Sequence, residues 1–243
     1  MLNLIISILS AAAIYAISYF AINAGYVWST IFAAAIFMAL NFILSKRIMN
    51  KVTVIMESAG KVLQTGKFDV AIKGMEEALQ YSKWMLMIES QIRSQIGTVQ
   101  FLKKDFNAAL PNLQKTVAKN WVAIGMLGVI YMRKKEYEKM IKAFEKGVKA
   151  NSSEALIWNL YAYCLSKIGE RDKAIAVLNR AVKKVTGDER TASNLKALQN
   201  NAKMKMKSFG EMWYQFHLET VPMSMRMQAG GRGAKGGRKM VRR

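Results

Sequence analysis

Two segments of this 243-residue chain match each other when one is shifted along the sequence by 34 residues. KEYEKMIKAFEKGV, residues 135–148, then lies over ERDKAIAVLNRAV, residues 170–182, and Gly128 lies over Ala162. Small residues at fixed places with larger ones between them indicate helical hairpins stacked into a solenoid, because helices approach most closely at small side chains. An unrelated helical bundle is the alternative, and it is disfavoured by several matches at one offset.

The pattern resembles the tetratricopeptide repeat family, whose consensus runs W..LG..Y…A…F..A. The resemblance covers about residues 52–186 and is most specific in its fourth copy. It implies an α-solenoid of about four helical hairpins. The matched positions are Ile124, Leu127, Gly128, Tyr131, Met140, Phe144 and Gly147 in the third copy, and Trp158, Tyr161, Ala162, Leu165, Ala174, Leu178 and Ala181 in the fourth.

Two earlier copies match the same pattern more weakly. If Ala71, Ala109, Met140 and Ala174 are equivalent, the successive spacings are 38, 31 and 34 residues, and the first two copies should contain altered loops. Pro111 is expected inside a second helix. The matched positions are Ala59, Gly66, Ala71, Met75 and Ala78 in the first copy, and Ile96, Gly97, Ala109, Leu113 and Thr116 in the second.

The first 45 residues contain no Asp, Glu, Lys, Arg or His. Two apolar runs, each about as long as a helix needs to cross a bilayer, are separated by the short link NAGY. We predict a transmembrane hairpin over residues 1–46, with helices at about 2–22 and 27–45 and a turn at Gly25. The residues expected to let the two helices approach closely are Ala12, Ala16, Ala35 and Ala39.

The charges that follow the hairpin predict its orientation. Lys46, Arg47 and Lys51 flank the end of the second run, whereas the link has no positive charge. The positive-inside rule therefore places residues 46–243 on the cytoplasmic side of a membrane, which we expect to be a bacterial inner membrane. A cleaved signal peptide is disfavoured because no Lys or Arg precedes the first run. A buried soluble helix pair is disfavoured because no polar outer face is visible.

Residues 187–222 are expected to form capping and aromatic helices after the repeats. A helix early in this segment could cover the open end of the array, which would otherwise expose an apolar face. The aromatic stretch SFGEMWYQFHLETVP, residues 208–222, packs against the last repeat in one interpretation and lies in the membrane interface in the other.

Residues 223–243 are rich in glycine and have seven basic and no acidic residues, which predicts a disordered tail. Such a tail is attracted to phosphate-rich surfaces. Anionic lipid of the cytoplasmic leaflet, ribosomal RNA and the absence of any partner are three alternatives. The residues expected to contact an anionic surface are Arg226, Arg232, Lys235, Arg238, Lys239, Arg242 and Arg243.

No residue pattern points to an enzyme. The chain has one cysteine, Cys164, and one histidine, His217, which excludes a Cys/His zinc site within one chain. Cys164 falls within a repeat helix and is expected to be a small core residue. The glycines of the tail lack the strand and helix that accompany a phosphate-binding loop. We therefore expect no catalytic residue, metal or cofactor.

The resemblance implies that the first helices of the hairpins line a groove that binds proteins or peptides. We predict an all-α scaffold, anchored by the hairpin, that binds a partner at the cytoplasmic membrane surface through a groove of mixed apolar and basic character. The alternative is a membrane-tethered nucleic-acid or ribosome binder that acts through the tail. The expected groove residues are Val129, Met132, Arg133, Asn159, Tyr163 and Lys167.

Overall fold

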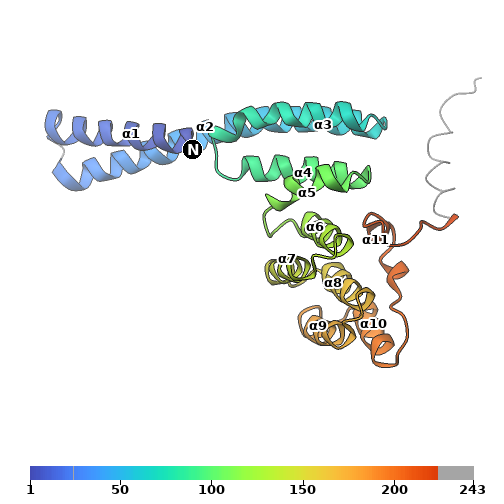
Figure 1. Cartoon of the computed structure of the whole chain (residues 1–243). Coiled ribbons are helices and arrows are strands. Elements are labelled where there is room, and N and C mark those ends of the chain that lie inside the picture. Colours follow the sequence, from blue (N-terminus) through green and yellow to red (C-terminus); the bar gives the residue numbers. More distant parts are fainter. Residues whose placement is uncertain (24, 224–243) are drawn as a thin grey trace, which may run out of the picture. The chain divides into compact units, whose positions relative to one another are not determined.

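The computed structural model describes residues 1–23 and 25–223, and all regular structure within these residues is helical (Figure 1). The expected all-α class is therefore confirmed. The chain forms two compact units, Met1–Asn151 and Ser152–Arg243.

The first unit begins with an antiparallel helical hairpin, as expected (Figure 1). Helix α1 spans Leu2–Ala16 and continues as a short π-helix, η1, over Ile17–Ala21. The backbone turns through left-handed conformations at Asn23 and Gly25, with φ of 56° and 73°. Glycine adopts this conformation without steric cost, which explains its place in the turn.

Helix α2 corrects one predicted boundary. It spans Gly25–Gln64 without interruption, instead of ending near residue 45. At Lys46 the side chains change from uncharged to charged, but the backbone stays helical. No proline interrupts the chain there, and the backbone hydrogen bonds of a helix do not depend on side-chain charge. The hairpin and the first repeat therefore share one helix.

The most deeply buried residues of the hairpin are small and polar, and its exposed face is apolar. Asn3, Ser7, Ser18 and Ser29 are buried, with 0 to 3% of their surface exposed. The three serine hydroxyls donate to backbone carbonyls of the preceding turn at 2.8 to 3.0 Å, so their burial leaves no hydroxyl unpaired. These small polar residues replace the alanines predicted to lie at close contacts, because Ala12, Ala16, Ala35 and Ala39 are all exposed.

The outer face of the hairpin has large apolar side chains. Leu9, Phe20, Met38 and Phe42 each expose between 64 and 79% of their surface. A helix pair that folds in water shows the opposite pattern, with apolar residues between the helices. The hairpin therefore exposes to its surroundings the surface that a soluble helix pair would bury.

Four helical hairpins follow the expected repeat pattern. The residues taken as equivalent, Ala71, Ala109, Met140 and Ala174, are all completely buried. Each lies in the second helix of its hairpin. The hairpins are α2 with α3 (Phe68–Glu77), α4 (Ile88–Leu102) with α5 (Phe106–Gln114), α6 (Trp121–Arg133) with α7 (Tyr137–Ala150), and, in the second unit, α8 (Ala155–Lys167) with α9 (Arg171–Lys184).

The irregular loops predicted for the early copies are present. A 3-10 helix, η2, covers Ala78–Lys83, and Met87 has a left-handed backbone with φ of 69°. This segment accounts for the long spacing between the first two copies. Pro111 lies inside α5, as expected, and the Asp105 carboxylate accepts a hydrogen bond from the Ala108 amide at 3.1 Å and so caps this helix.

Two glycines of the repeat pattern lie at the closest helix contacts. A Cβ atom at Gly128 would overlap the ring of Phe144, and one at Gly97 would come within 2.8 Å of Leu113 Cγ. The small residues required by the repeat pattern therefore have a direct steric cause.

In the second unit, helix α10 (Glu189–Gln199) packs against α8 and α9. It is followed by η3 (Met206–Phe209) and α11 (Glu211–Tyr214). The Asp188 carboxylate caps α10 by accepting from the Thr191 amide at 3.0 Å. Burial acts to raise the pKa of Asp188, but hydrogen bonds from Thr191 and Arg190 outweigh it and lower the pKa.

Candidate partner-binding surfaces of the repeats

The first unit contains a groove between the first helices of its first two repeats, α2 and α4. Its volume is about 650 Å³. Val52, Met75, Ile92 and Val99 are its buried residues, and Glu57 is its only charged residue. We call it the α2–α4 groove, and it is lined by Met49, Val52, Thr53, Met56, Glu57, Gly60, Leu63, Met75, Gln91, Ile92, Gln95, Thr98, Val99 and Leu102.

The chemistry of the α2–α4 groove suits an apolar segment of another protein. Methionine side chains are unbranched and polarisable, so they adapt to partner side chains of different shapes. The exposed amides of Gln91 and Gln95 can pair with polar groups of a bound chain. The groove is thus less basic than predicted for the array, because the lysines and arginines of this region lie elsewhere.

Sequence reasoning missed this groove because it placed the candidate residues in the last two copies. The repeat resemblance does include the first copy from about residue 52, but the expected groove residues come only from the third and fourth copies. A periodic pattern of apolar residues in the sequence could have indicated this groove. Met49, Met56 and Leu63 recur at intervals of seven, which places them on one face of a helix.

Three predicted groove residues lie in α6 of the first unit. Val129 is completely buried, and Met132 is half-buried. Arg133 is exposed, and its guanidinium lies 4.7 Å from the centroid of the Phe106 ring. Among these three, Arg133 has the most surface with which to contact a partner.

In the second unit, Asn159 is completely buried by contacts with α10. Its amide nitrogen donates to the Ala155 carbonyl and to Thr191 Oγ1, both at 2.8 Å, and its oxygen accepts from Asn194 at 2.9 Å. These bonds satisfy the side chain inside the protein. Asn159 therefore joins α8 to α10 and has no surface open to a partner.

Tyr163 is covered by the aromatic C-terminal segment. Its ring meets that of Trp213 edge-on with centroids 4.7 Å apart, and its hydroxyl donates to Glu219 Oε1 at 3.3 Å. Burial and the nearby Glu219 carboxylate raise the pKa of Tyr163. Trp213 and Phe216 are completely buried, which confirms packing against the last repeat as the correct interpretation of this segment.

The remaining predicted residues differ in their surroundings. Lys167 is exposed, with its ammonium group 5.2 Å from the centroid of the Tyr163 ring. Cys164 is completely buried, as predicted for a core residue, and burial raises the pKa of its thiol. The seven basic tail residues Arg226, Arg232, Lys235, Arg238, Lys239, Arg242 and Arg243 lie outside the described residues.

One ion-pair network lies at the start of α4. The Glu89 carboxylate accepts from Lys115 at 2.8 Å and from Arg93 at 2.7 Å, and these contacts lower the pKa of Glu89 to about 2.

Within the described ranges, 1–23 and 25–223, no three His, Cys, Asp or Glu side chains are grouped as metal ligands would be.

Comparison with known proteins identifies part of the array. A family model described as tetratricopeptide repeat matches residues 123–154 and 155–183. The first match coincides with the hairpin of α6 and α7 and the second with that of α8 and α9. No curated protein matches the sequence.

Several solved structures are similar to this chain. The MamA RS-1 ArsTM double mutant is 16% identical, with a TM-score of 0.50 over 75% of this chain and 97% of that one. MamA 41-end from Desulfovibrio magneticus RS-1 is 15% identical, with a TM-score of 0.49 over 76% and 98%. TTC0263, a thermophilic TPR protein of Thermus thermophilus, is 19% identical, with a TM-score of 0.44 over 75% and 98%. The first likeness shows a shared fold.

Proposed function

We propose that this chain, which contains tetratricopeptide repeats, is a membrane-anchored scaffold that binds another protein through its repeat array. The observation that carries the membrane part is the hairpin with its polar residues inside. The observation that carries the binding part is the α2–α4 groove, which opens beside the proposed membrane-spanning segment of the same helix.

The length and burial of the two N-terminal helices support insertion into a bilayer. Leu2–Ala21 and Gly25–Gln64 are long and apolar enough to span one. Only 11% of the apolar window of the first and 6% of that of the second is buried within the protein, whereas the core helix of a soluble protein is mostly buried. In lipid, serine and asparagine between helices are stabilising because they pair away from the hydrocarbon.

The proposed orientation follows from Lys46, Arg47 and Lys51, which favour a cytoplasmic location for the repeats. An anchor of this kind confines the array to the membrane surface. Confinement raises the effective concentration of any partner that is also at the membrane, so that a modest groove affinity is sufficient for stable association.

The partner is a protein segment with apolar side chains, bound in the α2–α4 groove. Met56 lines the groove, whereas Val54 lies two residues away on the same helix and is exposed outside it. A charge at Met56 must be desolvated when a partner binds, which costs several kcal/mol, whereas a charge at Val54 stays in water.

The test compares Met56→Lys with its matched control, Val54→Lys, in the full-length protein isolated from membranes in mild detergent. Proteins that copurify with wild type and with Val54→Lys should be absent from Met56→Lys. Equal partner sets from all three proteins would remove the α2–α4 groove from the proposal. Circular dichroism at the same temperature checks that all three are folded.

A further inference from the structure

A second cavity lies at the point where α2 leaves its uncharged segment. It has a volume of about 360 Å³ and lies between α2 and the segment that contains η2. We call it the headgroup cavity, and its lining comprises Leu44, Arg47, Ile48, Asn50, Lys51, Tyr81 and Trp84. Two basic groups, an amide, two aromatic rings and two aliphatic side chains thus meet in one small space.

The depth of the cavity matches the layer of lipid headgroups. Residues 26–45 rise about 30 Å as a helix, which is the thickness of the hydrocarbon core. On this scale Arg47 and Lys51 lie about 3 and 9 Å beyond its boundary. The headgroup layer is about 5 to 7 Å thick on each side, so Arg47 lies within it and Lys51 lies just beyond its outer edge.

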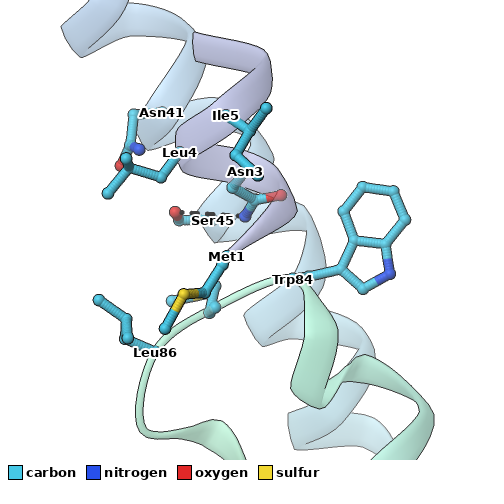
Figure 2. Close-up of a pocket in the computed structure, with 9 residues that line it drawn as sticks. Met1, Asn3, Leu4, Ile5, Asn41, Ser45, Trp84 and Leu86 are labelled. Carbon is cyan, nitrogen blue, oxygen red and sulfur yellow. Dashed lines mark hydrogen bonds between the residues drawn. The ribbon is translucent and has the colours of Figure 1, made fainter. Parts of the chain in front are cut away.

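Trp84 is held at the same level by the start of the hairpin. The Asn3 amide donates to the Trp84 carbonyl at 3.2 Å, and the amino group of Met1 donates to the Lys83 carbonyl. The side chain of Asn3 also donates to Ser45 Oγ, at 3.5 Å. Figure 2 shows the Trp84 ring directed away from Asn3 and Ser45. These bonds hold the backbone of Trp84 beside the last residues of the uncharged segment of α2, a depth that tryptophan prefers.

The two basic groups have no acidic partner within the described part of the chain. Neither Arg47 nor Lys51 is within ion-pair distance of a carboxylate there, and the next acidic residue on α2 is Glu57. Both side chains are exposed. Their charges are thus available to an anion that enters the cavity.

We propose that the headgroup cavity binds the phosphate of an anionic phospholipid in the cytoplasmic leaflet. The planar guanidinium of Arg47 suits two phosphate oxygens, and Lys51 adds a second positive charge. Asn50 supplies hydrogen bonds to glycerol or headgroup hydroxyls. Leu44, at the boundary of the hydrocarbon core, contacts the first carbons of the acyl chains. This inference rests on the proposed membrane insertion and names a lipid partner for it.

The experiment measures lipid retention by native mass spectrometry of the full chain in a non-ionic detergent. Phosphatidylglycerol and phosphatidylcholine are titrated separately. Wild type should retain one phosphatidylglycerol at a concentration at least about tenfold below that needed for phosphatidylcholine, because two positive charges near the membrane surface favour the anionic lipid. Soluble glycerol phosphate in millimolar excess should leave the lipid bound. Displacement by it would show a site for free phosphate and overturn the lipid assignment.

Two double variants separate a site from general surface charge. Arg47→Gln with Lys51→Gln should reduce phosphatidylglycerol binding to the level of phosphatidylcholine. Lys46→Gln with Lys83→Gln removes the same charge close by but changes no lining residue of the cavity, and it should keep the preference. Equal losses in both variants would overturn the proposal. Arg47→Lys, which keeps the positive charge but not the planar guanidinium, should keep part of the preference for phosphatidylglycerol.

A separate measurement distinguishes a wrong lipid site from a wrong membrane anchor. Alkaline carbonate washing of membranes reports on insertion alone. A protein that stays in the pellet but shows no lipid preference refutes the headgroup cavity and leaves the anchor intact. A protein that is washed from the membrane refutes both.

Discussion

At the scale of single residues, the repeats depend on a few positions where no side chain fits. Gly128 is the clearest case, because its α-carbon faces the ring of Phe144 from the second helix of the same hairpin. The ring is completely buried, so it would have to shift against closely packed neighbours to admit a methyl group at Gly128. The consensus glycine of the third copy thus permits the tight approach of α6 and α7.

Gly128→Ala should therefore destabilise the protein although alanine is the better helix former. Overpacking of this kind costs roughly 1–3 kcal/mol and exceeds the gain of about 1 kcal/mol in helix propensity. Gly60→Ala is the matched control, since a Cβ at Gly60 meets nothing within 4 Å, and it should be neutral or stabilising. Thermal unfolding in detergent, followed by circular dichroism, measures both. A Gly128→Ala protein as stable as Gly60→Ala would contradict this packing.

Asp188 gives a prediction for pH dependence. Its folded pKa is lowered, so the carboxylate stabilises the fold above its unfolded pKa of about 4, and this contribution is lost as the pH falls through the folded pKa. Asp188→Ala should cost about 1 kcal/mol at pH 7 through loss of the cap. Asp188→Asn keeps a capping oxygen and should cost less.

Unfolding measured at about pH 7 and pH 3 tests this assignment. The difference in stability between wild type and Asp188→Ala should shrink at the lower pH, where the wild-type carboxylate begins to protonate. A difference that grows in acid would mean that the charged form of Asp188 does not stabilise α10.

At the scale of elements, the sequence was sufficient for what depends on local pattern. The apolar runs, the turn at Gly25 and the alignment of Ala71, Ala109, Met140 and Ala174 follow from periodicity and are found in the structure. The predicted end of the second apolar helix was wrong, because a change in polarity does not end a helix. The residues predicted to lie between α1 and α2 were also wrong, since serine and alanine are both small and the sequence alone does not distinguish them.

The candidate groove could be predicted only in part, for a different reason. The repeat register correctly places Asn159 and Tyr163 on the first helix of the fourth hairpin. Their burial depends on α10 and on the aromatic segment, which are about 30 to 50 residues away in sequence and have no repeat pattern of their own. Long-range contacts of this kind are not encoded in local periodicity.

Trp213 tests the contact between the aromatic segment and α8. Trp213→Ala removes a completely buried indole beside Tyr163 and should cost about 3–5 kcal/mol. The adjacent Met212 is exposed, so Met212→Ala should change stability by less than about 0.5 kcal/mol. Chemical denaturation of the full chain measures both, and similar effects of the two substitutions would contradict the packing of this segment.

At the scale of the whole molecule, polarity is divided along the sequence. All 16 acidic and 37 basic residues lie after residue 45, and the formal net charge is +21. The basic residues directly after the uncharged hairpin, Lys46, Arg47 and Lys51, favour one orientation, with the repeats on the cytoplasmic side, because positive charges next to the end of a membrane helix are retained there. The apolar outer face of the hairpin and the positive charge after it therefore support the same arrangement by independent physical effects.

The last prediction concerns this arrangement directly. Single cysteines are placed at Asn23, in the turn of the hairpin, and at Lys196, which is exposed on α10. Cys164 does not interfere, because it is completely buried and its thiol has a raised pKa. An impermeant thiol reagent should label Asn23→Cys in intact cells and Lys196→Cys only after lysis. Labelling of Lys196→Cys in intact cells would reverse the orientation and place the repeats outside the cytoplasm.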